Sequence, residues 1–116
     1  MSYQVPYTFV LKALYPIRPT IRKMLGGYGL SINKKLVLLL RDSNINMQYN
    51  GVYVAALPEF YTELLEEIQV NKTDVDIDGS KNSWLFISED LIGFEQKVEL
   101  ACSLIKSEDE RIGKIQ

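Results

Sequence analysis

Residues 20–40, TIRKMLGGYGLSINKKLVLLL, carry the clearest structural pattern in the chain. Short apolar groups alternate here with turn-forming residues: Ile21 to Leu25 precedes a glycine pair, and Tyr28 to Ile32 precedes Asn33-Lys34. This pattern is typical of successive antiparallel strands joined by tight turns. Leu36 to Leu40 is apolar on both faces of a strand, which predicts a central strand covered by helices.

The chain beyond this stretch predicts further strands. Asn50-Gly51 is a strong signal for a two-residue hairpin turn, with residues 52–57 as the following strand. The strand before the turn would carry the alternating residues Ile45, Met47 and Tyr49. A longer loop over residues 43–51 is the alternative. Two more strands are expected, one where Val75 and Ile77 alternate with aspartates and one at residues 84–87, with residues 78–83 between them.

Three amphipathic helices are expected around the sheet. The first spans Val5 to Leu14. The second opens at Pro58 and carries the apolar stripe Phe60, Tyr61, Leu64, Leu65 and Ile68. The third begins after Ser88 as its N-cap and carries the stripe Phe94, Val98, Ala101, Cys102 and Ile105. The predicted fold class is therefore α+β: two layers, with a mainly antiparallel sheet of about five to six strands packed against N-terminal, middle and C-terminal helices.

Size and composition predict one domain. The 116 residues are 47% hydrophobic and 24% charged, which suits a packed core. We expect a single domain over residues 1–116, with a polar tail that frays over 107–116. Cys102 has no second cysteine for an internal disulfide, and no apolar run approaches the roughly 20 residues of a membrane helix. A cytoplasmic protein without membrane association is the expectation.

The charge is unevenly distributed along the chain. Residues 1–41 contain seven Lys or Arg and no acid, a charge of +7. Residues 42–116 contain six bases and fifteen acids, a charge of −9, so the whole chain carries −2. One interpretation is a basic surface for nucleic acid or phosphate. The other is that the two segments neutralise each other within the fold or across a dimer.

The residue types argue against common catalytic and metal sites. Without histidine, the chain cannot form Ser-His-Asp or Cys-His catalytic systems or imidazole zinc sites. Cys102 lies on an apolar stripe and is expected to pack in the core. Asp74, Asp76 and Asp78 match the first half of a calcium loop, but Leu85 stands where that loop needs a bidentate Glu. We therefore expect a solvated acidic strand, and no metal, cofactor or catalytic residue.

Gly26-Gly27-Tyr28-Gly29 is the most unusual local motif. The cations that flank it are Arg22, Lys23, Lys34 and Lys35. Glycine-rich turns can aim backbone N–H groups at an anion, which would make these eight residues a binding site. Neither GxxxxGK[ST] nor GxGxxG is present, however. The alternative is a turn and bulge in which the backbone requires glycine.

The run Arg22 to Leu30 resembles the R-x-M-F-G-G-Y-G motif of the TfoX N-terminal domain family, with Leu25 where the family usually has Phe. The similarity extends through the apolar strand to Leu57, and Trp84 with its following helix is similar to the YjbR/MmcQ group. The resemblance implies a compact antiparallel sheet packed on helices, in bacterial proteins associated with competence regulation or with no assigned activity. It implies no catalytic residues. We expect no separate C-terminal domain of the full-length TfoX kind, so competence regulation is not carried over.

These observations predict a non-enzymatic regulatory or adaptor domain that forms a homodimer. Its basic N-terminal half would contact nucleic acid or an acidic protein. The alternative is a domain that binds a small phosphate or carboxylate ligand at the glycine motif. An enzyme is the third and least favoured hypothesis, because the chain has no histidine and no nucleophile and base pair can be identified.

Overall fold

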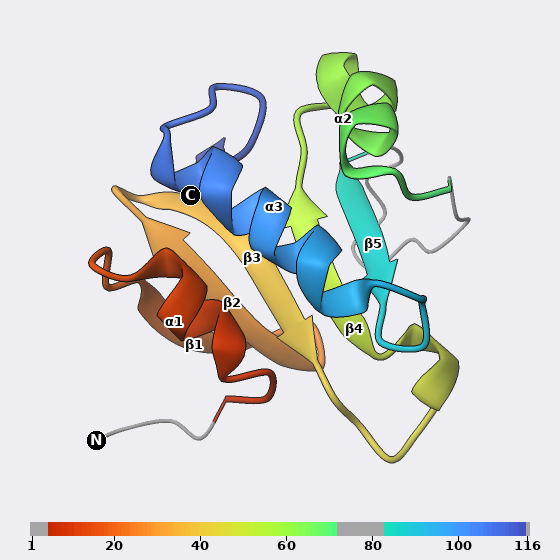
Figure 1. Cartoon of the computed structure of the whole chain (residues 1–116). Helices are drawn as coiled ribbons and strands as arrows, with labels where there is room; N and C mark the ends of the chain where they lie inside the picture. The colour runs from red at the N-terminus through yellow and green to blue at the C-terminus, as the bar shows by residue number, and fades with distance from the viewer. Residues whose placement is uncertain (1–4, 72–82, 116) are drawn as a thin grey trace.

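The computed structural model describes residues 5–71 and 83–115. It shows an α+β fold with an antiparallel sheet, as the sequence predicts (Figure 1). The strands are β1 Thr20–Met24, β2 Gly27–Ile32, β3 Lys35–Arg41, β4 Gly51–Ala55, β5 Trp84–Ser88 and β6 Lys114–Ile115. Their order in the sheet is β1-β2-β3-β4-β5, and β6 pairs with β3. The strand expected at Val75 and Ile77 lies outside the described residues.

Two tight turns build the β1–β2–β3 meander. Leu25-Gly26 and Asn33-Lys34 all have positive φ, between 51° and 78°, as a two-residue type I′ hairpin requires. The first turn lies one residue earlier than the glycine pair suggests. Met24 pairs with Gly27 and Arg22 with Gly29, so the motif forms the start of β2 and not an open loop.

β3 is the central strand and is buried on both faces, as predicted. A bulge explains how its five apolar residues divide between the faces. Leu30 pairs with Leu38 and Ser31 with Leu36, which leaves Val37 as an extra residue in β3. Val37 and Leu38 consequently both face the larger core, whereas Leu36 and Leu39 belong to a second apolar cluster.

The larger core joins the sheet to the helices α1 Phe9–Leu14, α2 Tyr61–Ile68 and α3 Phe94–Lys106. α1 and α3 lie across the same face of the sheet (Figure 1). Apolar side chains at helical spacing form this layer: Val10, Leu14, Leu64, Ile68, Val98, Ala101 and Ile105. Cys102 is fully buried among them, where the sequence places it.

The middle helix opens at Pro58 as a 3₁₀ turn, Pro58–Phe60, which leads into α2 at Tyr61. The other two predicted helix starts are wrong, and the backbone shows why. α1 begins at Phe9 and not at Val5, because Tyr7 has a φ of 56°, which a right-handed helix excludes. α3 begins at Phe94 and not after Ser88. Ser88 instead starts a turn, in which the Leu91 N–H donates to its carbonyl oxygen at 3.1 Å, and Gly93 has a φ of 79°.

The predicted strand at residues 45–49 is also wrong, and the alternative of a longer loop is correct. Asn46 has a φ of 53° and residues 47–49 form a short 3₁₀ turn. Asn50 has an extended backbone and enters β4 directly, so no hairpin turn forms at Asn50-Gly51. The loop connects neighbouring antiparallel strands, because Arg41 pairs with Gly51.

Residues 107–115 pair with the sheet and contact α2. Ile112 is buried and forms a bridge with Ala56, and β6 pairs with the first two residues of β3. Arg111 binds Asp109 at 2.6 Å and Glu67 of α2 at 2.9 Å. This segment therefore adds a short strand to the sheet next to β3 and contacts the end of β4. Within the described residues, no helix has the length and apolar character to cross a membrane.

The second apolar cluster lies on the sheet face away from α1 and α3. It contains Leu36, Leu39, Tyr53, Ala55, Trp84 and Phe86. The Tyr53 and Phe86 rings stack with centroids 4.6 Å apart, and the Lys114 ammonium lies 4.2 Å from the Trp84 ring centroid. β3, β4 and β5 are thus apolar on both faces.

Candidate functional site

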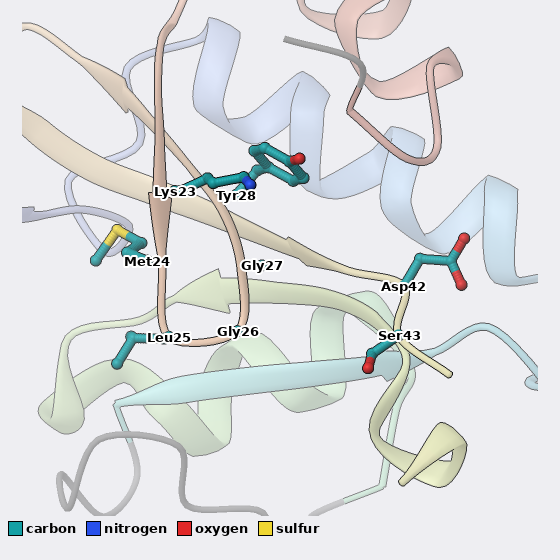
Figure 2. Close-up of a pocket in the computed structure, with 8 residues that line it drawn as sticks. All are labelled: Lys23, Met24, Leu25, Gly26, Gly27, Tyr28, Asp42 and Ser43. Atoms are coloured by element: carbon teal, nitrogen blue, oxygen red, sulfur yellow. The ribbon is translucent and has the colours of Figure 1, made fainter. Parts of the chain in front are cut away.

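A shallow hollow of about 530 Å³ lies beside the β1–β2 turn (Figure 2). Its lining comes from the hairpin and from the start of the loop after β3: Lys23, Met24, Leu25, Gly26, Gly27, Tyr28, Asp42 and Ser43. In Figure 2, Lys23 and Tyr28 lie on one side of the hairpin, and Asp42 and Ser43 lie across from the turn. The hollow gathers four of the eight predicted site residues, namely Lys23, Gly26, Gly27 and Tyr28.

Close packing leaves little room for a side chain at two glycines of β2, against backbone at Gly27 and against side chains at Gly29. A Cβ at position 27 would overlap the carbonyl oxygen of Leu40, and one at position 29 would overlap the Met24 sulfur. β2 is also paired on both sides, so its N–H groups point at β1 and β3. This arrangement does not favour a cradle for phosphate at residues 27–29.

The four predicted cations do not converge. Arg22 and Lys23 are exposed neighbours on β1, and their side chains leave opposite faces of the sheet. The Lys23 ammonium lies 6.0 Å from the Tyr28 ring centroid. Lys34 and Lys35 lie at the other end of β2, in and after its turn. Lys35 lines a second hollow, which it shares with Glu108 and Asp109.

Arg41 and Asn50 organise the loop beside the hollow. The Arg41 guanidinium donates to Asn50 Oδ1 at 2.7 Å and to the carbonyl oxygens of Ile45 and Asn46 at 2.7 and 3.0 Å. Asn50 is 1% exposed; its Oδ1 also accepts from the Ser43 N–H, and its Nδ2 donates to the Ser43 carbonyl oxygen, both at 2.9 Å. Sequence reasoning missed both residues, because Asn50-Gly51 has the pattern of a hairpin turn and the partner of Arg41 lies nine residues away.

Tyr7 fixes the chain before α1 to the end of the sheet. Its hydroxyl lies 2.7 Å from Glu89 Oε1 and 3.0 Å from the Arg41 carbonyl oxygen. Burial, and then the adjacent Glu89 carboxylate, raise the pKa of Tyr7 far above its usual value. The hydroxyl therefore stays protonated and serves as a hydrogen-bond donor.

The Cys102 thiol and the Tyr53 hydroxyl are both buried in the core. Burial raises the pKa of Cys102 to about 12, which keeps its sulfur as a neutral thiol. Burial likewise raises the pKa of Tyr53 to about 12, and its hydroxyl donates to the Tyr49 carbonyl oxygen at 2.6 Å. In residues 5–71 and 83–115, no group of three or more acids or thiols is placed to hold a metal ion.

Six of the seven basic residues of segment 1–41 are exposed, and Arg41 is half-buried. In the described part of the chain, all three ion pairs involve Arg111, which contacts Asp109, Glu67 and Glu63. No basic residue of segment 1–41 takes part in them. We define the basic edge as the exposed residues Arg18, Arg22, Lys23 and Lys34. Arg18 precedes β1, whose Thr20 pairs with Ser31, so the basic edge runs along β1 to the β2–β3 turn.

The chain was compared with models of protein families, with curated proteins and with solved structures, and none of them matches it. The chain is therefore described by its fold and its site: it is an α+β domain with an open antiparallel sheet and a basic edge.

Proposed function

We propose that this chain is a non-enzymatic adaptor domain, similar to the TfoX N-terminal type, that binds an anionic partner along its basic edge. One observation carries the proposal. Arg22 and Lys23 are exposed on an outer strand, and no ion pair of the described residues joins them to the acidic part of the chain. Exposed cations without a counter-charge attract an anionic surface and accelerate association.

An acidic protein suits the basic edge better than nucleic acid does. The edge offers four cations, and the whole chain has a net charge of −2 and an isoelectric point of about 5.1. Nucleic-acid modules usually carry a strong excess of basic residues, because each phosphate contact contributes to affinity. An acidic protein segment carries less charge density and can be matched by a short basic stripe. Homodimerisation stays a prediction from the sequence.

The test is binding of fluorescently labelled polyglutamate and of a labelled DNA duplex, measured by anisotropy at several salt concentrations. Polyglutamate should bind, and its affinity should fall steeply with salt. The double variant Arg22→Glu, Lys23→Glu should weaken binding about 10-fold or more, which corresponds to about 1.4 kcal/mol.

The matched control is Lys97→Glu with Lys106→Glu on α3, which changes the net charge by the same amount away from the basic edge. Its affinity should stay within about 2-fold of the unmodified chain. Equal losses in both double variants would mean that only net charge matters. No salt-dependent binding of either probe would overturn the proposal.

A further inference from the structure

The outer side of β1 is an open sheet edge. Among the described residues β1 pairs with β2 only, over the five pairs from Thr20↔Ser31 to Met24↔Gly27. Met24 and Gly27 close a two-residue turn, so they form a hydrogen-bonded pair of the ladder. Alternation then directs the N–H and C=O groups of Ile21 and Lys23 away from β2. These four groups are a template for one more strand.

The charges on β1 decide which strand fits this edge. If β1 paired antiparallel with β1 of a second copy through Ile21 and Lys23, Arg22 would lie opposite Arg22 of that copy. Like charges directly opposite each other destabilise a sheet. An acidic strand reverses the sign of the same contacts. Arg22 and Lys23 leave opposite faces, so acids at two successive positions would meet both cations.

The apolar neighbours define the flanks of the fitting strand. Ile21 packs against the larger core on the helix side of the sheet. Met24 packs against the second apolar cluster on the other side. An incoming strand would therefore present apolar residues opposite Ile21 and Met24, with two acids between them. Pro19 has no N–H group and the turn begins at Leu25, so the contact is limited to about the length of β1.

We propose that the partner is an extended acidic segment of another protein, with the pattern apolar-acid-acid-apolar, which adds to the sheet as a strand beside β1. This inference rests on the proposed function and assigns its partner class and binding mode. The main-chain bonds would supply affinity and the two cations would select the sequence.

The experiment uses the full chain and a labelled, terminally blocked peptide of sequence TVEEVT, followed by anisotropy and by amide exchange. TVEEVT should bind, and TVKKVT should bind at least about 10-fold more weakly. The amides of Ile21 and Lys23 should become protected from exchange in the complex, because they would bond to the peptide backbone.

N-methylated peptides test the main-chain bonds with side chains unchanged. One peptide carries N-methyl groups at positions 3 and 5, and its control carries them at positions 2 and 4. Only one set of N–H groups faces β1 in a paired strand, so one peptide should bind at least about 10-fold more weakly and the other within about 2-fold.

The outcomes separate this inference from the proposed function. If TVEEVT binds but both methylated peptides bind as well and the Ile21 and Lys23 amides stay unprotected, strand addition is excluded and electrostatic binding survives. The same conclusion follows if polyglutamate binds and TVEEVT does not. Binding of DNA alone would overturn an acidic protein segment as the partner. Absence of binding by every anionic probe would overturn both proposals.

Discussion

At the scale of single residues, Gly27 shows how a glycine can be required without binding anything. Its φ is not positive, yet a Cβ there would overlap the Leu40 carbonyl oxygen. Gly26, one residue earlier, has a φ of 78°, and a Cβ there would make only an ordinary contact with Arg41 Nε at 3.9 Å. The two neighbours therefore depend on glycine for different physical reasons, one steric and one conformational.

This difference predicts unequal costs of substitution. Gly27→Ala pushes β2 away from β3 and should lower the free energy of unfolding by about 3 kcal/mol. Gly26→Ala meets no atom closely and should cost about 1 kcal/mol, from the left-handed backbone alone. Urea denaturation of both variants measures the difference. Equal losses, or a neutral Gly27→Ala, would contradict the steric explanation.

At the scale of elements, the loop between β3 and β4 is held in one shape by its interior bonds. Arg41 and Asn50 bind its backbone at several points, while the residues Ile45 and Met47 are 71% and 58% exposed. The loop thus keeps apolar groups at the surface on a backbone that these hydrogen bonds hold.

Removal of the Asn50 amide should loosen this loop. Asn50→Ala leaves the Ser43 N–H and one Arg41 N–H without their acceptor, and the expected loss of unfolding free energy is about 2 kcal/mol. Amide exchange within residues 43–49 should also accelerate. Gln48→Ala, an exposed change in the same loop, is the control and should stay within about 0.5 kcal/mol. If the two variants behaved alike, the loop would not depend on Asn50.

Local patterns predicted most elements and failed where one backbone angle interrupted them. The runs at residues 20–40 and the helical stripes carried enough repeated signal to place the strands β1 to β3 and the apolar faces of α2 and α3. The positive φ of Tyr7 and of Gly93 shortens two helices, and the spacing of apolar residues does not predict these backbone angles. Asn50 appears in a turn dipeptide, but a partner nine residues away, Arg41, determines its role.

The candidate site was predictable in its charge and not in its geometry. The absence of acids before Asp42 is visible in the sequence, and it points to the segment that carries the exposed cations Arg22 and Lys23. That Lys34 lies at the opposite end of β2 depends on the strand register, and that Lys35 shares a hollow with Glu108 depends on long-range packing. Spacing along the chain contains neither fact.

At the scale of the whole molecule, Arg111 ties the C-terminal segment to α2. It contacts Glu63 and Glu67 across the fold and Asp109 within its own turn. The Arg111 side chain lowers the pKa of Asp109, chiefly through their hydrogen bonds. Asp109 is 14% exposed, so solvent screens this pair only in part.

The lowered pKa makes part of the stability dependent on pH. The Asp109 contribution is present above the pKa of an unfolded Asp, about 3.9, and is lost as the pH falls through the lower folded value. Asp109→Asn should therefore be less stable than the unmodified chain at about pH 7, and the gap should narrow at about pH 3. Urea denaturation at both pH values measures it, with Glu110→Gln as an exposed control. A gap that stays constant would exclude this coupling.

The pairing of β3 has a consequence for the order in which the sheet assembles. On one side β3 meets β2 through a two-residue turn; on the other it meets β4 beside Leu38 and β6 beside Lys35. Lys35 and its partner Ile115 are 80 positions apart along the chain. Closing so long a segment costs more entropy than forming the hairpin, and folding slows as such distant contacts dominate. We expect β3 to pair with β2 early in folding and with β6 late.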